Sequence, residues 1–151
     1  MSKTLGKGEQ RFIDEVSRLL LPWGVPAAAA RLYGYLLLCP RPVSLDEIIR
    51  DLGVSKSSAS VAARLLERYT LAQRHREPGT KRALYTVAEN YESMIQQQNK
   101  LLDALADQLG AGARVVASKA VITRLEEMAE FYRAMRGAME DTMRRWKRTR
   151  S

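Results

Sequence analysis

Residues 55–64 gather hydroxyl and cationic side chains in a segment without any acidic residue. A serine hydroxyl both donates and accepts hydrogen bonds, and an arginine can hold a guanine edge or a phosphate through parallel hydrogen bonds. Residues 74–82 add further cations around one acid, Glu77. This chemistry suits a polyanion such as nucleic acid. The candidate contact residues are Ser55, Lys56, Ser57, Ser58, Ser60, Arg64, Arg74, Arg76, Lys81 and Arg82.

Other kinds of chemistry lack the residues they need. The chain has one cysteine, Cys39, and one histidine, His75. It therefore has no internal disulfide and no Cys/His zinc site. We find no nucleophile–base pairing, no glycine loop that cradles phosphate and no cluster of metal ligands. We expect neither enzymatic activity nor a bound cofactor, and we place His75 on a surface.

The positive charge is concentrated in two parts of the chain. The 151 residues include 25 Lys and Arg against 17 Asp and Glu, which gives a net charge of +8. Residues 44–82 hold 8 basic and 5 acidic residues, and residues 144–151 hold 5 basic residues and no acid, whereas residues 83–143 are net acidic. A uniform cationic coat would not give this pattern, although a single charge run is often only a solvated surface.

Local capping signals place the first candidate segment on the second of two helices. Ser44 stands three residues before Glu47, which is a capping box that begins a helix. Gly53 can take the left-handed conformation that ends that helix, and Ser55 caps the next one, which runs to about residue 69 or 70. The pattern predicts a helix, a tight turn and a second helix.

The second helix has two distinct faces when its residues are spaced at about 100°. The inner face holds small apolar residues for close packing. The outer face is polar, is expected to carry no acid, and can enter the major groove of DNA. The inner residues are Ala59, Ala62, Ala63 and Leu66, and the outer residues are Ser57, Ser60, Val61, Arg64 and Arg68. A buried helical hairpin with a solvated serine face remains the alternative.

A β-hairpin follows, with strands on either side of Glu77-Pro78-Gly79-Thr80. Pro-Gly at the central positions indicates a type II turn. Beside the two helices, a basic hairpin is the wing of a winged helix-turn-helix, and its tip can reach phosphates or the minor groove.

Helical periodicity covers most of the remaining chain. An amphipathic helix over about residues 10–21 presents Phe12, Val16, Leu19 and Trp23, and a buried helix spans about residues 27–39. After residue 90, Gly110-Ala111-Gly112 is expected to separate two long helices. Each helix has a predicted apolar seam, which we expect to pack against the other helix and against a second chain. The seam residues are Tyr91, Ile95, Gln98, Leu102, Leu105 and Leu109 on the first helix, and Leu125, Met128, Tyr132, Met135, Met139, Thr142 and Trp146 on the second.

The predicted fold class is therefore mainly α, a winged helix-turn-helix with a short β-hairpin wing and long N- and C-terminal dimerisation helices. Residues 1–90 would form the DNA-binding domain with its N-terminal helices. Residues 91–151 would form a helical dimerisation region with a basic tail. The tail is either disordered or a helix end favoured by the helix dipole.

The segment SLDEIIRDLGVSKSSASVAARLLE (44–67), with the wing REPGTKR (76–82), resembles MarR-type bacterial transcription regulators. It is most similar to the GbsR-like branch, whose upstream Phe-x-x-Glu helix matches Phe12-Ile-Asp-Glu15 and whose apolar helix matches residues 25–38. The resemblance covers about residues 10–90. It implies a homodimer on a palindromic operator. It assigns the recognition-helix role to Ser55, Lys56, Ser57, Ser58, Ser60 and Arg64, and the wing role to Arg76, Lys81 and Arg82.

The leading hypothesis is a sequence-specific regulator of transcription that binds double-stranded DNA as a homodimer, with repression favoured over activation. The alternative is a winged-helix adaptor that binds proteins instead of DNA. No signal peptide or membrane span is expected, because residues 1–9 lack an apolar stretch and residues 25–39 are too short and contain Arg31. We expect a cytoplasmic protein without membrane contact.

Control by a small-molecule effector is left open. Some regulators of this branch respond to small osmoprotectant cations held by aromatic side chains. Core or interface packing is the favoured interpretation of the aromatic residues here, and a buried, inert thiol is favoured over a redox sensor for Cys39. The aromatic candidates are Trp23, Tyr33, Tyr35, Tyr91, Phe131, Tyr132 and Trp146.

Overall fold

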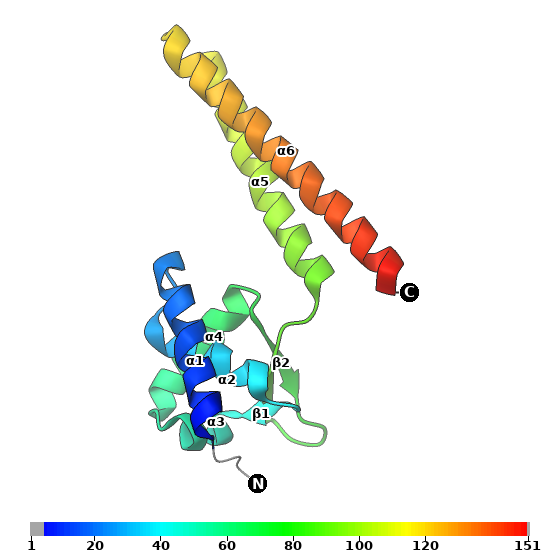
Figure 1. Cartoon of the computed structure of the whole chain (residues 1–151). Helices are drawn as coiled ribbons and strands as arrows, with labels where there is room; N and C mark the ends of the chain where they lie inside the picture. The colour runs from blue at the N-terminus through cyan, green and yellow to red at the C-terminus, as the bar shows by residue number, and fades with distance from the viewer. Residues whose placement is uncertain (1–4, 151) are drawn as a thin grey trace. The chain divides into compact units, whose positions relative to one another are not determined.

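Helix α2 (Ala27–Leu38) is the central element of the first of two structural units. The computed structural model describes residues 5–150, and the chain divides into units at residues 1–89 and 90–151 (Figure 1). Ala29, Ala30, Leu32 and Leu36 of α2 are buried. The prediction that this nearly all-apolar helix would be central is therefore confirmed.

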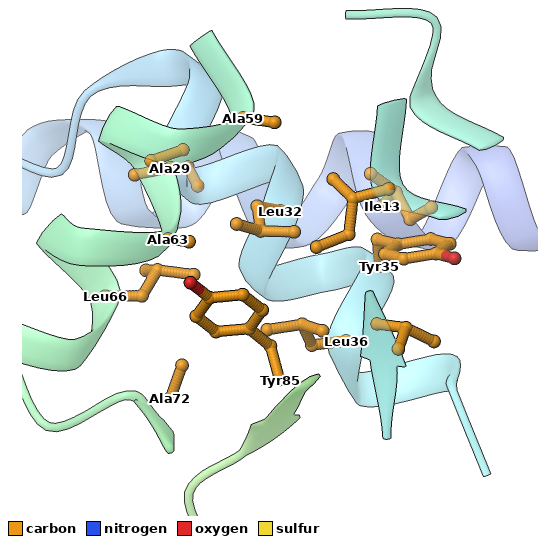
Figure 2. Packing of buried hydrophobic residues seen from close by; sticks show 14 of the residues in the cluster. Ile13, Ala29, Leu32, Tyr35, Leu36, Ala59, Ala63, Leu66, Ala72 and Tyr85 are labelled. Atoms are coloured by element: carbon orange, nitrogen blue, oxygen red, sulfur yellow. The ribbon is translucent and has the colours of Figure 1, made fainter. Parts of the chain in front are cut away.

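The first unit surrounds α2 with short helices and one small sheet. In chain order it contains α1 (Lys7–Leu20), a 3-10 turn (Leu21–Trp23), α2, β1 (Val43–Ser44), α3 (Leu45–Leu52), α4 (Lys56–Arg68), β2 (Ala72–Arg76) and β3 (Ala83–Val87). Side chains from α1, α2, α3, α4 and the strands form one buried cluster (Figure 2). The mainly helical winged helix-turn-helix predicted from the sequence is confirmed.

The sheet contains a third strand that the sequence did not reveal. All its strands are antiparallel and its order is β1-β3-β2. β1 pairs Val43 with Tyr85 and Ser44 with Leu84. Two residues are too few to show a periodic pattern. This pairing joins the segment that begins α3 to the second strand of the hairpin.

The apolar face predicted for α1 is wrong. Ile13 and Ser17 are the buried residues of α1, whereas Leu19 is 72% exposed and Trp23 is 85% exposed. Phe12 is exposed as well. The core-facing side is set by the contact of α1 with α2, which sequence periodicity alone does not define. The larger apolar side chains are left on the outside.

The second unit is a pair of long helices, α5 (Tyr91–Val115) and α6 (Lys119–Arg150). They run antiparallel, because Asp103 lies 3.0 Å from Arg136 and Asp107 lies 3.7 Å from Arg133. The expected helix break at residues 110–112 is wrong. Two glycines cost a helix only about 2 kcal/mol, and a Cβ on Gly112 would already lie 3.3 Å from Leu125 Cδ1, so this glycine permits close packing.

Of the predicted seam residues, Leu102 is buried as expected, and the other buried residues of the pair lie outside the predicted seams. On α5 the buried residues are Asn99, Leu102, Ala106 and Ala113, and on α6 only Ala129 is fully buried. The basic segment from residue 144 is helical through Arg150, so within the described residues the alternative of a disordered tail is wrong. Arg150 lies 3.9 Å from the ring of Trp146.

Candidate nucleic-acid interface

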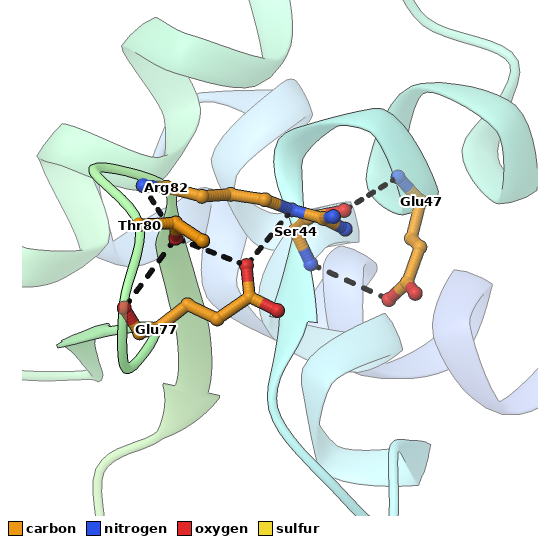
Figure 3. A network of polar contacts seen from close by, with 5 residues as sticks. All are labelled: Ser44, Glu47, Glu77, Thr80 and Arg82. Atoms are coloured by element: carbon orange, nitrogen blue, oxygen red, sulfur yellow. Dashed lines mark hydrogen bonds and ion pairs between the residues drawn. The ribbon is translucent and has the colours of Figure 1, made fainter.

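Two hydrogen-bonded caps set the positions of α3 and α4. Ser44 Oγ accepts a hydrogen bond from the backbone N–H of Glu47, at 3.2 Å, and Glu47 Oε2 accepts one from the N–H of Ser44, at 3.3 Å (Figure 3). Gly53 ends α3 with a φ of 65°, and Ser55 Oγ accepts from the N–H of Ser58 at 3.1 Å. The predicted capping box, glycine turn and serine cap are all confirmed.

The inner face of α4 packs as the sequence predicts. Ala59, Ala62, Ala63 and Leu66 are all buried, and the helix contacts both α2 and α3 (Figure 2). Alanine side chains let the helix axes approach closely, so α4 is held firmly with one face turned outward.

The outer face of α4 presents the candidate residues to different degrees. Lys56, Ser57 and Arg64 are exposed, whereas Ser58 and Ser60 are partly buried. Arg64 Nε donates to the backbone oxygen of Ser60 at 3.4 Å, and the guanidinium group stays exposed at the surface of the helix. The exposed residues are the ones that can contact a base edge or a phosphate.

Arg68 and Val61 also lie open on this face, although neither was chosen as a contact residue. The helical projection already places both residues on the outer face, at about 180° and 200° from Ala59. Arg68 adds a fourth exposed polar or cationic group to the face. Val61 is the one apolar side chain in the exposed set that the structure describes on α4.

An acidic residue borders the outer face, which corrects the expectation that it carries none. Glu67 falls only about 20° from Ser60 on the helical projection. Its Oε1 lies 3.8 Å from Nε of Arg74 on β2. The ion pair neutralises part of the charge of Arg74 and joins the end of α4 to the hairpin.

The hairpin forms as the sequence predicts. β2 and β3 pair in register from Ala72 opposite Val87 to Arg76 opposite Ala83. Gly79 has a φ of 78°, and the N–H of Thr80 donates to the oxygen of Glu77 at 3.2 Å. A positive φ at the second central position is the mark of a type II turn.

Four cations surround one hollow on the wing. The hollow has a volume of about 320 Å³, and its lining consists of Arg74, His75, Arg76, Lys81, Arg82 and Ala83. Glu77 Oε2 lies 3.7 Å from Arg82 Nε and offsets part of this charge. His75 is exposed as expected, with Nε2 2.8 Å from Thr86 Oγ1. Convergent cations of this kind favour a phosphate oxygen.

The remaining candidates show no reactive arrangement. Among residues 5–150 no group of three His, Cys, Asp or Glu side chains is placed to hold a metal ion. The partly buried Cys39 donates to the backbone oxygen of Tyr35 at 3.3 Å. Within the described part of the chain, no helix combines the length and apolar character that crossing a membrane requires.

The aromatic candidates are dispersed rather than gathered. Tyr91 and Trp146 meet edge to face with ring centroids 5.7 Å apart, and Phe131 and Tyr132 do so at 5.8 Å. Tyr35 is buried in the first unit, where its hydroxyl donates to Asp51 at 2.6 Å. Packing therefore accounts for these contacts.

Comparison with known proteins finds similarity to transcriptional regulators. The profile of MmpR5-like MarR family transcriptional regulators matches residues 90–149. Over 85 residues the chain is 26% identical to the HTH-type transcriptional regulator YvaV of Bacillus subtilis, and over 83 residues 25% identical to the HTH-type transcriptional repressor OpcR of the same organism. These matches cover 56% and 55% of the chain.

The fold agrees over nearly the whole chain. The crystal structure of a transcriptional regulator superposes with a TM-score of 0.82, at 23% sequence identity, over 93% of this chain and 99% of the other. The chain has a winged helix-turn-helix fold, and residues 90–149 are similar to the MmpR5-like MarR family.

The chain spans about half the length of the two Bacillus subtilis relatives, 48% of YvaV and 45% of OpcR. The matched family model and both relatives are transcriptional regulators, in agreement with the non-enzymatic class expected from the sequence.

Proposed function

We propose that this protein is a regulator of the MarR family that binds double-stranded DNA in a sequence-specific way and represses transcription. The observation that carries the proposal is the exposed outer face of α4 beside a wing whose four cations line one hollow. The name of the relative OpcR, a transcriptional repressor, supports repression. A cytoplasmic location and the absence of membrane contact are part of the same proposal.

In this proposal α4 lies in the major groove. Arg64 contacts a guanine or a phosphate, while Ser57, Ser58 and Ser60 contact bases or backbone from the same helix. Ser55 and Lys56 lie at the helix start, where backbone N–H groups and the cation favour a phosphate. The wing residues Arg74, Arg76, Lys81 and Arg82 bind phosphates and set the orientation of the protein on the duplex.

Homodimerisation on a palindromic operator belongs to the proposal, with residues 91–151 as the dimerisation region and residues 1–90 as the DNA-binding domain. Large apolar side chains on the long helices support it, since Leu101 is 66% exposed and Phe131 is 61% exposed. A lone monomer would leave these side chains in water. Light scattering should give twice the monomer mass, and the operator should contain two half-sites about one helical turn apart.

Membership of the GbsR-like branch and control by a small-molecule effector complete the proposal. The branch rests on Phe12 to Glu15 in α1 and on the apolar residues of α2. For an effector, the second unit offers an apolar hollow of about 290 Å³, which Tyr91, Met94, Ile95 and Trp146 help to line. A thermal-shift screen with small organic cations tests this part separately.

Retardation of genomic DNA fragments by the full chain tests the central proposal. We expect one or a few fragments to be retained at low salt, with an affinity that falls steeply as salt rises because phosphate neutralisation releases counterions. Binding that ignores salt, or no retained fragment at low salt, would contradict it.

A protein-binding adaptor is the second candidate, favoured by one observation. Val61 and Leu65 of α4, with Pro26 and Ala28 near the start of α2, line an apolar groove of about 280 Å³. Such a groove could take an apolar side chain of a partner protein. Failure to retain any DNA at low salt would favour this candidate.

A further inference from the structure

Val61 is half-exposed, at 50%, in the middle of the face that the proposed function turns toward DNA. Ser57 lies one helical turn before it and Arg64 lies three residues after it, so both are its neighbours along the surface of α4. The neighbouring alanines at positions 62 and 63 are buried. The apolar side chain therefore stands among groups that bind base edges.

Protein stability gives little reason for a valine at position 61. A β-branched residue in a helix is less favourable than alanine by several tenths of a kcal/mol, and this helix uses alanine at positions 59, 62 and 63. Half of the side chain stays in water, so its burial contributes little to the stability of the fold. Its branched Cβ does fix one rotamer, which holds both methyl groups in a set position at little entropic cost.

The surroundings of Val61 combine apolar and cationic character. The groove beside it, about 280 Å³ in volume, is walled mainly by apolar side chains, including Pro26, Ala28 and Leu65. The exposed cations Lys56, Arg64 and Arg68 lie on the same helix. A partner protein that placed an apolar side chain in the groove would also need three acidic groups to pair with these cations. The DNA major groove instead presents an apolar group between two phosphate backbones.

That apolar group is the 5-methyl of thymine, which projects into the major groove and distinguishes thymine from adenine, guanine and cytosine. We propose that Val61 reads a thymine methyl group in each operator half-site, next to the base pair that Arg64 contacts. This inference rests on the proposed DNA-binding function and assigns it a specificity-determining residue.

Deoxyuridine in place of thymidine isolates the methyl group, because uracil pairs identically and lacks only that group. Duplexes selected by the full chain from a randomised pool serve as probes, with each conserved thymine replaced in turn. Removing one methyl contact of about 0.8 kcal/mol should weaken binding about fourfold per half-site, at one symmetric position. The variant Val61→Ala should bind thymine and uracil duplexes equally at that position.

Val61→Thr is the matched variant, because it keeps the shape and one methyl group and should retain part of the discrimination. Circular dichroism should show both variants folded. The inference is overturned if no thymine methyl affects binding, or if Val61→Ala discriminates as well as the wild type does. In that case the groove remains available for a protein contact. Selection of no duplex at all at low salt would instead refute DNA binding itself, and the inference with it.

Discussion

A Cβ built on Gly34 of α2 would lie only 3.1 Å from Cα of Ile13 on α1. The two helix backbones therefore touch at this point, and the side chain of Ile13 is completely buried there. The contact explains why α1 turns Ile13 inward and leaves Phe12 and Leu19 outside.

Gly34→Ala should destabilise the protein, because the added methyl group would have to push α1 away from α2. Overpacking of this kind costs about 1–3 kcal/mol. Urea unfolding followed by circular dichroism measures the change. Gly8→Ala on α1 is the control, since among residues 5–150 no contact lies within 4 Å of its Cβ position. It should be neutral or stabilising by up to about 1 kcal/mol, and equal effects of the two variants would refute the contact.

Tyr35 should make the protein less stable at alkaline pH. Burial, followed by the hydrogen bond to Asp51, raises the pKa of its phenol far above the ordinary value near 10. Burial also raises the pKa of Tyr85, with Glu67 as the next cause. Above pH 10 the unfolded chain loses these protons while the folded chain keeps them. The contribution of each phenol to the free energy of unfolding is therefore fully present below pH 10. Above pH 10 it falls by at most about 1.4 kcal/mol per pH unit for each group.

Tyr35→Phe should flatten this alkaline loss of stability. At neutral pH the variant should be less stable by about 1 kcal/mol, since it lacks the hydrogen bond to Asp51. Urea unfolding between pH 7 and pH 11 measures both effects, and the further change Tyr85→Phe should flatten the curve again. Parallel curves for wild type and Tyr35→Phe would contradict the prediction.

Arg64 and Arg82 should affect DNA binding in different ways. Arg64→Ala should reduce discrimination at one base pair by about 1–3 kcal/mol. Arg82→Ala should weaken binding about equally for all duplexes and reduce the salt slope by about 1, as loss of one phosphate contact does. Binding to a randomised duplex pool at several salt concentrations separates the two. An unchanged base preference for Arg64→Ala would count against its proposed role.

Glu67→Gln should strengthen DNA binding. The change keeps the side-chain shape but leaves the charge of Arg74 free for a phosphate. We expect roughly a threefold to tenfold gain near 0.1 M salt and a steeper salt slope. The same charge change at Glu15 on α1, where the acid pairs with Arg18, should have a smaller effect. Weaker binding by Glu67→Gln would show instead that the ion pair with Arg74 positions the wing for DNA.

Local signals were enough to predict the helix-turn-helix and the hairpin of the first unit. The cap pairs Ser44 with Glu47, the glycine at position 53 has a positive φ, and Pro78-Gly79 forms the turn. Each of these features could be predicted because it involves residues within a few positions of one another. Their geometry is set by backbone and side-chain chemistry that needs no distant partner.

Long-range contacts determined what these signals could not. Strand β1 exists only because β3 lies beside it, and helix α5 continues through Gly112 because Leu125 of α6 lies close to it. The acidic Glu67 next to the cationic face shows its effect only through Arg74, seven residues along the chain and on another element.

Caps, turns and periodicity are local properties of the chain, so the helix-turn-helix, the basic hairpin and the small inner face of α4 could be predicted from the amino acids alone. The buried face of α1, the cations that meet around the wing hollow and the exposure of Val61 became clear only from the folded chain. Those features depend on which backbones approach one another, as Gly34 and Ile13 do, and close packing of distant segments is what sets that approach.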